Sequence, residues 1–355
     1  MLCIIFFGPD ALCQSIQEDV WFLSDSLRQG RRFGEPGVVD AAFWVQHEFR
    51  TMGLQTGVQH FSSSGKAGHN VEGLLRVPGS SKYIIVMACI DGVGTYDGAV
   101  YPGADANASG VASMMALARS MTGHSRPAPY VYTSPRKLDK ELSRFKLDVP
   151  LCRDGIVRGG EVLPVEDYVE EEDDEPFILM PGPKKAEEKY VPGKWLGTGR
   201  PRHNVLFVAV DGHNEHSAGA ASLWESLKAR GITKSDILMV VNLDTMGSNM
   251  APPQRYWKDY LIILGGSRYE SSIASCNSGL GLHLYYDYYD SRAFTDMFYK
   301  RLGDQSVFVS QGIPSVMVTS GITMLTNKPG DHPSTLSYDL LERRIELLRR
   351  WLLKL

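Results

Sequence analysis

The sequence has no apolar run of about 18 residues, the length that a membrane-spanning helix needs. Positive charge does not predominate either, because 37 lysines and arginines are set against 41 aspartates and glutamates, for a net charge of -4 at pH 7. No cluster of basic residues forms a stripe suited to a phosphate backbone. We therefore expect neither a membrane span nor a nucleic-acid partner.

Cysteine is scarce as well, and its occurrences are Cys3, Cys13, Cys89, Cys152 and Cys276. No two of them have the close spacing of a zinc ribbon or a redox motif. An odd and scattered set does not indicate a disulfide framework. Cysteine usage therefore neither indicates nor excludes an oxidising compartment.

The N-terminus begins with a short apolar run, residues 1–8, followed by Ala-Leu-Cys-Gln at 11–14. This pattern resembles the end of a secretory signal peptide, although a basic region is absent and the run is short. A buried first strand is the alternative. We favour a signal-peptide remnant over residues 1–13, which predicts a periplasmic or secreted protein. Cys13 is then a candidate lipid-bearing cysteine, although Asp10 is a poor match to a lipobox.

Periodic patterns of apolar residues alternate between two kinds along the chain. Helical spacing is found at 15–29, 37–53, 109–121, 218–230, 291–302 and 338–353. Strand patterns, several of them continuous apolar runs, are found at 70–78, 82–91, 203–210, 237–244, 260–265 and 312–319. Continuous apolar runs are typical of strands that are covered on both faces. The alternation of strands with helices predicts an α/β sandwich.

Residues 122–202 interrupt this alternation. The segment carries many prolines and an acidic run at 166–175, and it is far longer than an ordinary connection between a helix and a strand. We interpret it as an insertion within a single domain that spans 14–355. The acidic run is expected to be a solvated loop, with cation binding as the alternative.

Three segments carry more specific information than the periodicity. They are Tyr-Pro-Gly-Ala-Asp-Ala-Asn-Ala-Ser-Gly-Val-Ala at 101–112, Asn-Val-Leu-Phe-Val-Ala-Val-Asp-Gly-His-Asn-Glu-His-Ser-Ala-Gly at 204–219 and Val-Asn-Leu-Asp-Thr-Met-Gly at 241–247. In this order and spacing they resemble the co-catalytic zinc aminopeptidases. That superfamily includes aminopeptidase Y, bacterial leucyl aminopeptidases, glutamate carboxypeptidase and glutaminyl cyclases. The resemblance covers roughly 14–121 and 203–355.

The resemblance implies a three-layer α/β/α sandwich with a central mixed β-sheet, of the zinc-aminopeptidase (phosphorylase/hydrolase-like) type. It also implies a particular chemistry. Two zinc ions about 3.5–4 Å apart activate a water molecule and polarise the scissile carbonyl, and a neighbouring carboxylate acts as general base. The superfamily therefore needs a histidine, a bridging aspartate, a Glu-Glu pair, a second aspartate and a final histidine.

The first positions of that set are altered in this chain. Cys89 stands where the first histidine is expected, although Asp91, which resembles the residue that orients it, is kept. Ala106 stands at the bridging aspartate. The Glu-Glu pair is replaced by His213, at the general-base position, and Asn214, at the ligand position.

Only one expected ligand, Asp244, is intact, because Asn327 stands where the final histidine is expected. Two carboxylates, Asp105 and Glu215, lie next to altered positions but out of register, and His332 lies near Asn327 and is also out of register. A thiolate can bind zinc, whereas an alanine side chain offers no donor atom. A normal two-zinc centre is therefore not expected.

The sequence thus predicts a non-classical or inactive homologue that uses the former catalytic cleft to bind a peptide, an amino-acid derivative or a protein, with no cofactor. A working metallopeptidase or amidohydrolase is the alternative, with one zinc ion between Cys89, His213 and Asp244 or a thiolate–imidazole pair of Cys89 and His213. A third hypothesis keeps two zinc ions by letting Asp105 and Glu215 take over.

Overall fold

The computed structural model describes residues 15–123, 156–158, 161–163 and 190–355. The chain divides into two compact units, 1–129 with 192–355 and 130–191. In the second unit β6 (Ile156–Arg158) pairs antiparallel with β7 (Glu161–Leu163). The expectations for the signal-peptide remnant, for Cys13 and for the acidic run at 166–175 lie outside the described residues.

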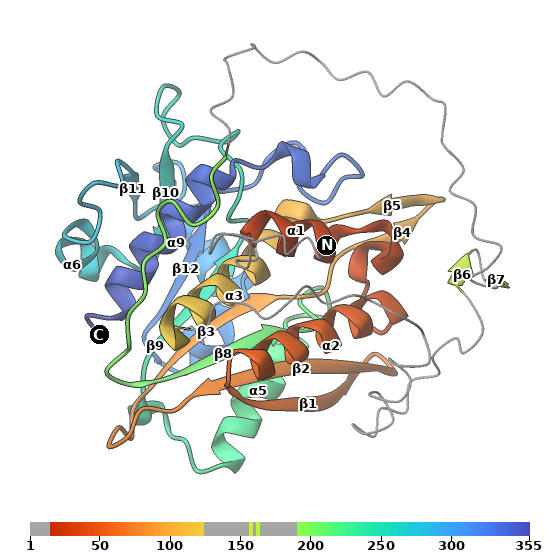
Figure 1. Ribbon diagram of the computed structural model, residues 1–355, viewed down its shortest axis with the longest axis horizontal. Coiled ribbons are helices and arrows are strands. Elements are labelled where there is room, and N and C mark those ends of the chain that lie inside the picture. The colour runs from red at the N-terminus through yellow and green to blue at the C-terminus, as the bar shows by residue number, and fades with distance from the viewer. Residues whose placement is uncertain (1–14, 124–155, 159–160, 164–189) are drawn as a thin grey trace, which may run out of the picture. The chain divides into compact units, whose positions relative to one another are not determined.

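An eight-stranded mixed sheet forms the centre of the first unit (Figure 1), in the order β1-β2-β8-β3-β9-β12-β10-β11. Its strands are β1 (Gln55–Ser63), β2 (Lys66–Leu75), β3 (Tyr83–Cys89), β8 (Asn204–Val210), β9 (Ile237–Asp244), β10 (Tyr260–Leu264), β11 (His283–Tyr285) and β12 (Ser315–Thr319). The middle strands β8, β3, β9 and β12 are parallel. On one side β2 pairs antiparallel with β8 and with β1, and on the other β10 pairs antiparallel with β12 but parallel with β11. A separate ribbon pairs β4 (Gly94–Tyr96) with β5 (Ala99–Tyr101).

Helices cover both faces of the sheet, which gives the expected three-layer sandwich. The helices are α1 (Ile16–Ser24), α2 (Pro36–Thr51), α3 (Ser109–Thr122), α5 (Ala218–Ala229), α6 (Glu270–Ala274), α7 (Arg292–Met297), α8 (Gln305–Ser310) and α9 (Tyr338–Leu352). One layer contains α1, α2, α3 and α9, and α3 contacts β3, β8 and β9. The other contains α5 and α8, whose Trp224 and Phe308 pack against sheet residues such as Met87. The predicted fold class is confirmed.

The expected helix at 15–29 is wrong in its second half. Helix α1 ends at Ser24, and Asp25 adopts an extended conformation. The Asp25 side chain accepts a hydrogen bond from the backbone N–H of Leu27 at 2.8 Å and so begins a new 3₁₀ turn, η2 (Ser26–Arg31). A short side chain that captures a nearby backbone N–H competes with helix continuation, and apolar periodicity does not reveal this competition.

The central strands explain why the apolar runs were continuous. Every residue of β8 is buried, as is every residue of β3 after Tyr83. Their carboxyl ends lie at the same edge of the sheet, since Cys89 pairs with Val210 and Thr319 with Asp244. Side chains that follow these strands therefore converge at one edge, which is where open α/β sheets bind ligands.

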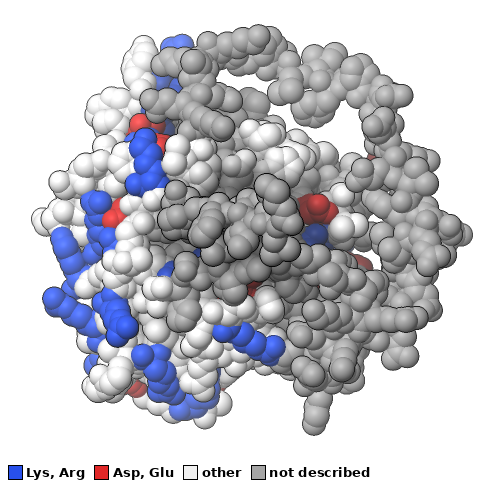
Figure 2. Space-filling view, viewed as in Figure 1, with Lys and Arg blue, Asp and Glu red and all other residues white. Residues whose placement is uncertain are grey.

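Among the described helices, none combines the length and apolarity needed to cross a membrane. Figure 2 shows lysine and arginine side chains along the left and lower margins of one face, with uncharged residues and a few acidic side chains between them. The absence of a nucleic-acid partner stays a prediction.

Arg31 connects the N-terminal helices to the loops around the sheet edge. Its guanidinium donates hydrogen bonds to the carbonyl oxygens of Leu23, Ile90, Pro102 and Gly103. The side chain is buried, and burial lowers the pKa of Arg31 to about 10, so it remains charged at neutral pH. One side chain thus provides hydrogen-bond donors for four carbonyl groups, including that of Ile90, the residue after Cys89.

We predict that Arg31→Met lowers the free energy of unfolding by at least about 3 kcal/mol, because several buried carbonyls lose their donor. Urea denaturation measures the loss. Arg32→Met is the matched control, since Arg32 is the exposed neighbour, and it should change stability by less than about 0.5 kcal/mol. Equal effects of the two substitutions would contradict the role given to Arg31.

Candidate functional site

A pocket of about 470 Å³ opens at the carboxyl ends of the parallel strands. Cys89 and Asp244 reach it from the last positions of β3 and β9, and His213 reaches it from the turn that follows β8. Ala106 and Asn327 also line it. The structure thus brings all of these sequence-predicted positions to one cavity, together with Asp91 and Asn214.

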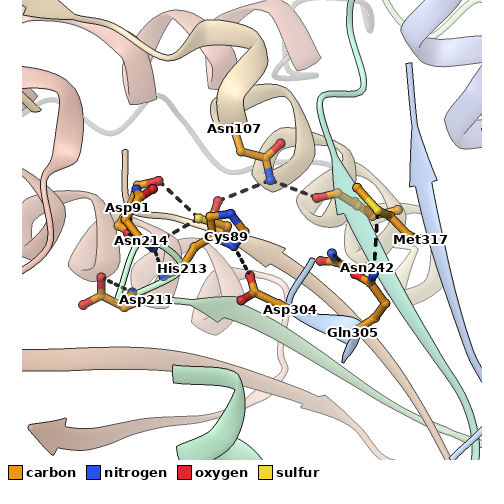
Figure 3. Close-up of polar contacts among 12 residues, drawn as sticks. Cys89, Asp91, Asn107, Asp211, His213, Asn214, Asn242, Asp304, Gln305 and Met317 are labelled. Carbon is orange, nitrogen blue, oxygen red and sulfur yellow. Dashed lines mark hydrogen bonds and ion pairs between the residues drawn. The ribbon is translucent and has the colours of Figure 1, made fainter. Parts of the chain in front are cut away.

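Asp91 organises the side of the pocket next to Cys89 (Figure 3). Its carboxylate accepts the thiol hydrogen of Cys89, with Sγ and Oδ1 3.0 Å apart. It also accepts the backbone N–H of His213 at 2.9 Å and longer hydrogen bonds of 3.4 Å from the backbone and side-chain amides of Asn214. Burial, with the Asp91 charge beside it, raises the pKa of the Cys89 thiol well above its ordinary value. The thiol is therefore protonated at neutral pH.

Asn107 holds the strand ends together across the pocket floor. Its side-chain amide donates to the carbonyl of Leu243 at 2.9 Å and to that of Cys89 at 3.4 Å. Its side-chain oxygen accepts from the backbone N–H of Thr245 at 3.0 Å and of Gly110 at 3.2 Å. Asn107 is thus a fixed point between β3, β9 and α3, and the peptide bond that joins Ala106 to it is cis.

The side chain of Asp105, the residue before Ala106, bonds to groups outside the pocket lining. Its Oδ1 accepts from the backbone N–H of Gly247 at 2.7 Å and from the hydroxyl of Ser109 at 3.0 Å. The carboxylate of Asp331 in turn accepts the backbone N–H groups of Asp105 and Ala106. Burial, with Asp331 nearby, raises the pKa of Asp105 to about 7. Asp105 is not among the residues that line the pocket.

The other two out-of-register side chains are also engaged elsewhere. Glu215 accepts a hydrogen bond from the Ser64 hydroxyl at 2.7 Å on the surface. His332 packs edge-on against Trp21, with ring centroids 5.4 Å apart. Neither residue lines the pocket.

Asp304 is a pocket residue that the sequence analysis missed. It directly precedes α8 and is only 1% exposed, and its Oδ2 lies 3.2 Å from Nδ1 of His213. The next residue, Gln305, fixes this position because it accepts from the amide of Asn242 on β9 at 2.8 Å and donates to the carbonyl of Phe298 at 2.9 Å. The only local sequence signal is a Gly-Asp pair before a short helix, which does not distinguish a site residue from an ordinary helix start.

Cys89, His213 and Asp304 form a group of metal-ligand type. One donor atom from each lies within 4.8 Å of the others. Asp244, which the sequence analysis placed beside the first two, is not part of this group. Burial raises the pKa of Asp244, whereas the Asp304 charge raises the pKa of His213 to about 10. The imidazole is therefore protonated at neutral pH when no metal is bound.

Comparison with known proteins agrees with this architecture. Residues 70–132 match the model of Peptidase family M28. The fold is similar to that of the LapA aminopeptidase of Legionella pneumophila, with a TM-score of 0.58 and 11% identity over 94% of this chain and 70% of that one. It is also similar to the zinc aminopeptidase BSAP of Bacillus subtilis, with a TM-score of 0.59 and 12% identity over 97% and 95% of the two chains. The resemblance to the zinc aminopeptidase superfamily is confirmed.

The glutaminyl cyclase of Fimbriiglobus ruber is another similar structure, with a TM-score of 0.61 and 15% identity over 98% of this chain and 97% of that one. No curated protein matches the chain. At these identities the likeness establishes a zinc aminopeptidase-type fold. The chemistry of the pocket has to be argued from the residues of this chain.

We predict that the His213 ring in chelator-treated protein titrates near pH 10, because the neighbouring Asp304 carboxylate stabilises the imidazolium. Proton NMR of the histidine ring measures this value. Asp304→Asn should lower the pKa toward its ordinary value of about 6.5. Asp244→Asn is the matched control and should lower it less, since Asp304 has the larger effect on His213.

The raised pKa of His213 also makes the free energy of unfolding depend on pH. A folded-state pKa above the unfolded one stabilises the protein fully below about pH 6.5, and this contribution is lost as the pH rises toward 10. The stability difference between wild type and Asp304→Asn should therefore decrease between these two pH values. A ring that titrates near 6.5 in both proteins would refute the assignment.

Proposed function

We propose that this protein is a peptidase-like binding protein, which uses the pocket to hold a peptide, an amino-acid derivative or a segment of another protein, without two-zinc hydrolysis. The observation that carries the proposal is the bridging position. Ala106 lines the pocket there, and its methyl group can bind no metal. A co-catalytic pair needs a shared carboxylate to hold two cations about 3.5–4 Å apart.

The surroundings of Ala106 support this proposal, because neither of the two out-of-register carboxylates, Asp105 and Glu215, takes the place of the missing one. Asp105 is held by Gly247 and Ser109 outside the pocket lining. Glu215 is held at the surface by Ser64. These contacts argue against the hypothesis that shifted loops rebuild the two-zinc centre.

The residues at the remaining ligand positions also argue against a two-zinc centre. The side-chain amide of Asn214 donates to Asp91, and a neutral amide is a weak zinc ligand. Asn327 offers only the same kind of group in place of an imidazole. The residues present therefore do not fit the two-zinc group of the superfamily.

The pocket is suited to holding a small ligand. Its volume of about 470 Å³ lies within the range of roughly 300–1,000 Å³ that is common for small-molecule sites. Its lining combines apolar side chains, such as Tyr288, Phe298 and Leu302, with the polar groups around Cys89. Apolar walls with a few fixed polar groups are the usual composition of a binding site.

A hydrolase of altered design is the second candidate. Its cysteine version is disfavoured, because the Cys89 thiol donates to Asp91 and its pKa is raised, whereas a nucleophilic cysteine needs a stabilised thiolate. Its single-metal version is favoured by the grouping of Cys89, His213 and Asp304. A periplasmic or secreted location also remains part of the proposal and depends on residues 1–13 alone.

We predict that protein purified without chelators does not hydrolyse an aminoacyl anilide above the blank, with or without added zinc. Hydrolysis that requires zinc and disappears with a chelator would overturn the proposal.

We also predict that an unmodified tripeptide binds in the pocket, as measured by isothermal titration calorimetry. Ile322→Arg should weaken binding at least about tenfold, or about 1.4 kcal/mol, because Ile322 lines the pocket and is 49% exposed. Met324→Arg is the matched control, since Met324 is 86% exposed on the same loop but does not line the pocket. Equal weakening by both substitutions would place the ligand outside the pocket.

A further inference from the structure

We propose that Cys89, His213 and Asp304 bind a single divalent cation of the zinc type at the floor of the pocket. This inference deepens the proposed function, because it places the ion where a bound ligand would meet it. The donor set differs from the superfamily's positions, since Asp304 comes from the start of α8 and Asp244 takes no part in it.

The spacing of the donor atoms supports the site. A tetrahedral zinc ion with nitrogen and oxygen ligands at about 2.0–2.1 Å places those ligands about 3.3 Å apart. The His213 Nδ1 and Asp304 Oδ2 atoms are already 3.2 Å apart. All three donor atoms lie within 4.8 Å of one another, so shifts on the order of 1 Å bring the set to the spacing of a tetrahedral ion.

An unpartnered oxygen supports the site independently of the spacing. The Oδ1 atom of Asp304, the second oxygen of the carboxylate whose Oδ2 lies beside His213, is buried and has no hydrogen-bond partner among the residues that the structure describes. A buried carboxylate oxygen without a donor is unfavourable, and native structures usually satisfy such atoms with water or an ion. Because Asp304 lines the pocket, a cation entering there can reach its carboxylate.

The charges at the pocket floor also call for a cation. The carboxylates of Asp91, Asp244 and Asp304 line the pocket, and the partly buried imidazole of His213 pairs with the last of them. A divalent ion bound by the Asp304 carboxylate, the neutral His213 ring and a Cys89 thiolate has no net charge. Two protons leave to solvent on binding, one from the Cys89 thiol and one from the His213 imidazolium, because the ion coordinates a thiolate and a neutral ring.

The donor types favour zinc over the hard cations. Thiolate and imidazole bind zinc well, whereas magnesium and calcium prefer sets made of oxygen atoms alone. Three protein ligands also leave one coordination position open toward the pocket. A ligand carbonyl or carboxylate could occupy that position, which would give the binding pocket a polar anchor in place of the lost two-zinc centre.

The test uses the full chain after treatment with a chelator and its removal. Zinc is titrated by calorimetry against a competing chelator, and cobalt is titrated in parallel by absorption spectroscopy. We expect one equivalent of zinc, and a thiolate-to-cobalt charge-transfer band in the near ultraviolet. Failure to bind zinc, or cobalt binding without the thiolate band, would overturn the proposal.

Substitutions then identify the ligands. Cys89→Ser and Asp304→Asn should each weaken zinc binding by more than the roughly 10–100-fold that follows loss of an outer partner. Cys276→Ser is the matched control, because Cys276 is also a buried free cysteine but contacts the carbonyl of Ser272 in α6. It should bind zinc as wild type does.

The substitution Asp244→Asn distinguishes this donor set from the alternative set of Cys89, His213 and Asp244. Zinc affinity should stay within a few-fold of wild type, whereas a loss as large as that of Asp304→Asn would overturn the assignment. Zinc should also raise the melting temperature of wild type and of Asp244→Asn but not of Asp304→Asn. If Cys89→Ser does not fold, the cobalt band and Asp304→Asn decide the question.

The two proposals fail in different ways. Tripeptide binding that persists in a protein unable to bind zinc contradicts the metal site and leaves the proposed function standing. One equivalent of zinc together with chelator-sensitive hydrolysis contradicts the proposed function and leaves the metal site standing.

Discussion

The carboxylate of Asp91 is the interaction on which the architecture of the pocket depends. It receives the Cys89 thiol from the end of β3 and the backbone of His213 and Asn214 from the turn after β8. Because these bonds join two adjacent parallel strands at their carboxyl ends, they determine which side chains can face the cavity. The resemblance implies that a residue at the position of Asp91 orients a metal-binding histidine. In this chain Asp91 instead accepts hydrogen bonds from the Cys89 thiol and from the turn after β8.

The contacts that stabilise the fold of this chain can therefore be considered separately from the chemistry of its pocket. The fold depends on buried strands and on polar cross-links such as Asn107, which bonds to the main chain of β3, β9 and α3. None of these contacts needs a metal ion. An alanine at position 106, where the resemblance implies a bridging aspartate, leaves all of these cross-links in place, so the fold does not depend on a carboxylate there.

Much of the fold could be predicted from the sequence, because continuous apolar runs such as β8 are covered on both faces. The break in the first helix could not, because it depends on one hydrogen bond from the side chain of Asp25. The pocket positions taken from motifs, such as Cys89 and His213, do meet in one cavity. Asp304 was missed, because its place beside His213 results from the packing of Gln305 against β9 and not from any local pattern.

We propose that the pocket holds one metal ion at most, bound by Asp304 and not by Asp244. Anomalous X-ray diffraction at the zinc edge, from crystals grown with excess zinc, tests this most directly. We expect one peak in the pocket, within bonding distance of Cys89, His213 and Asp304. Two peaks about 3.5–4 Å apart, with one beside Asp244, would contradict it.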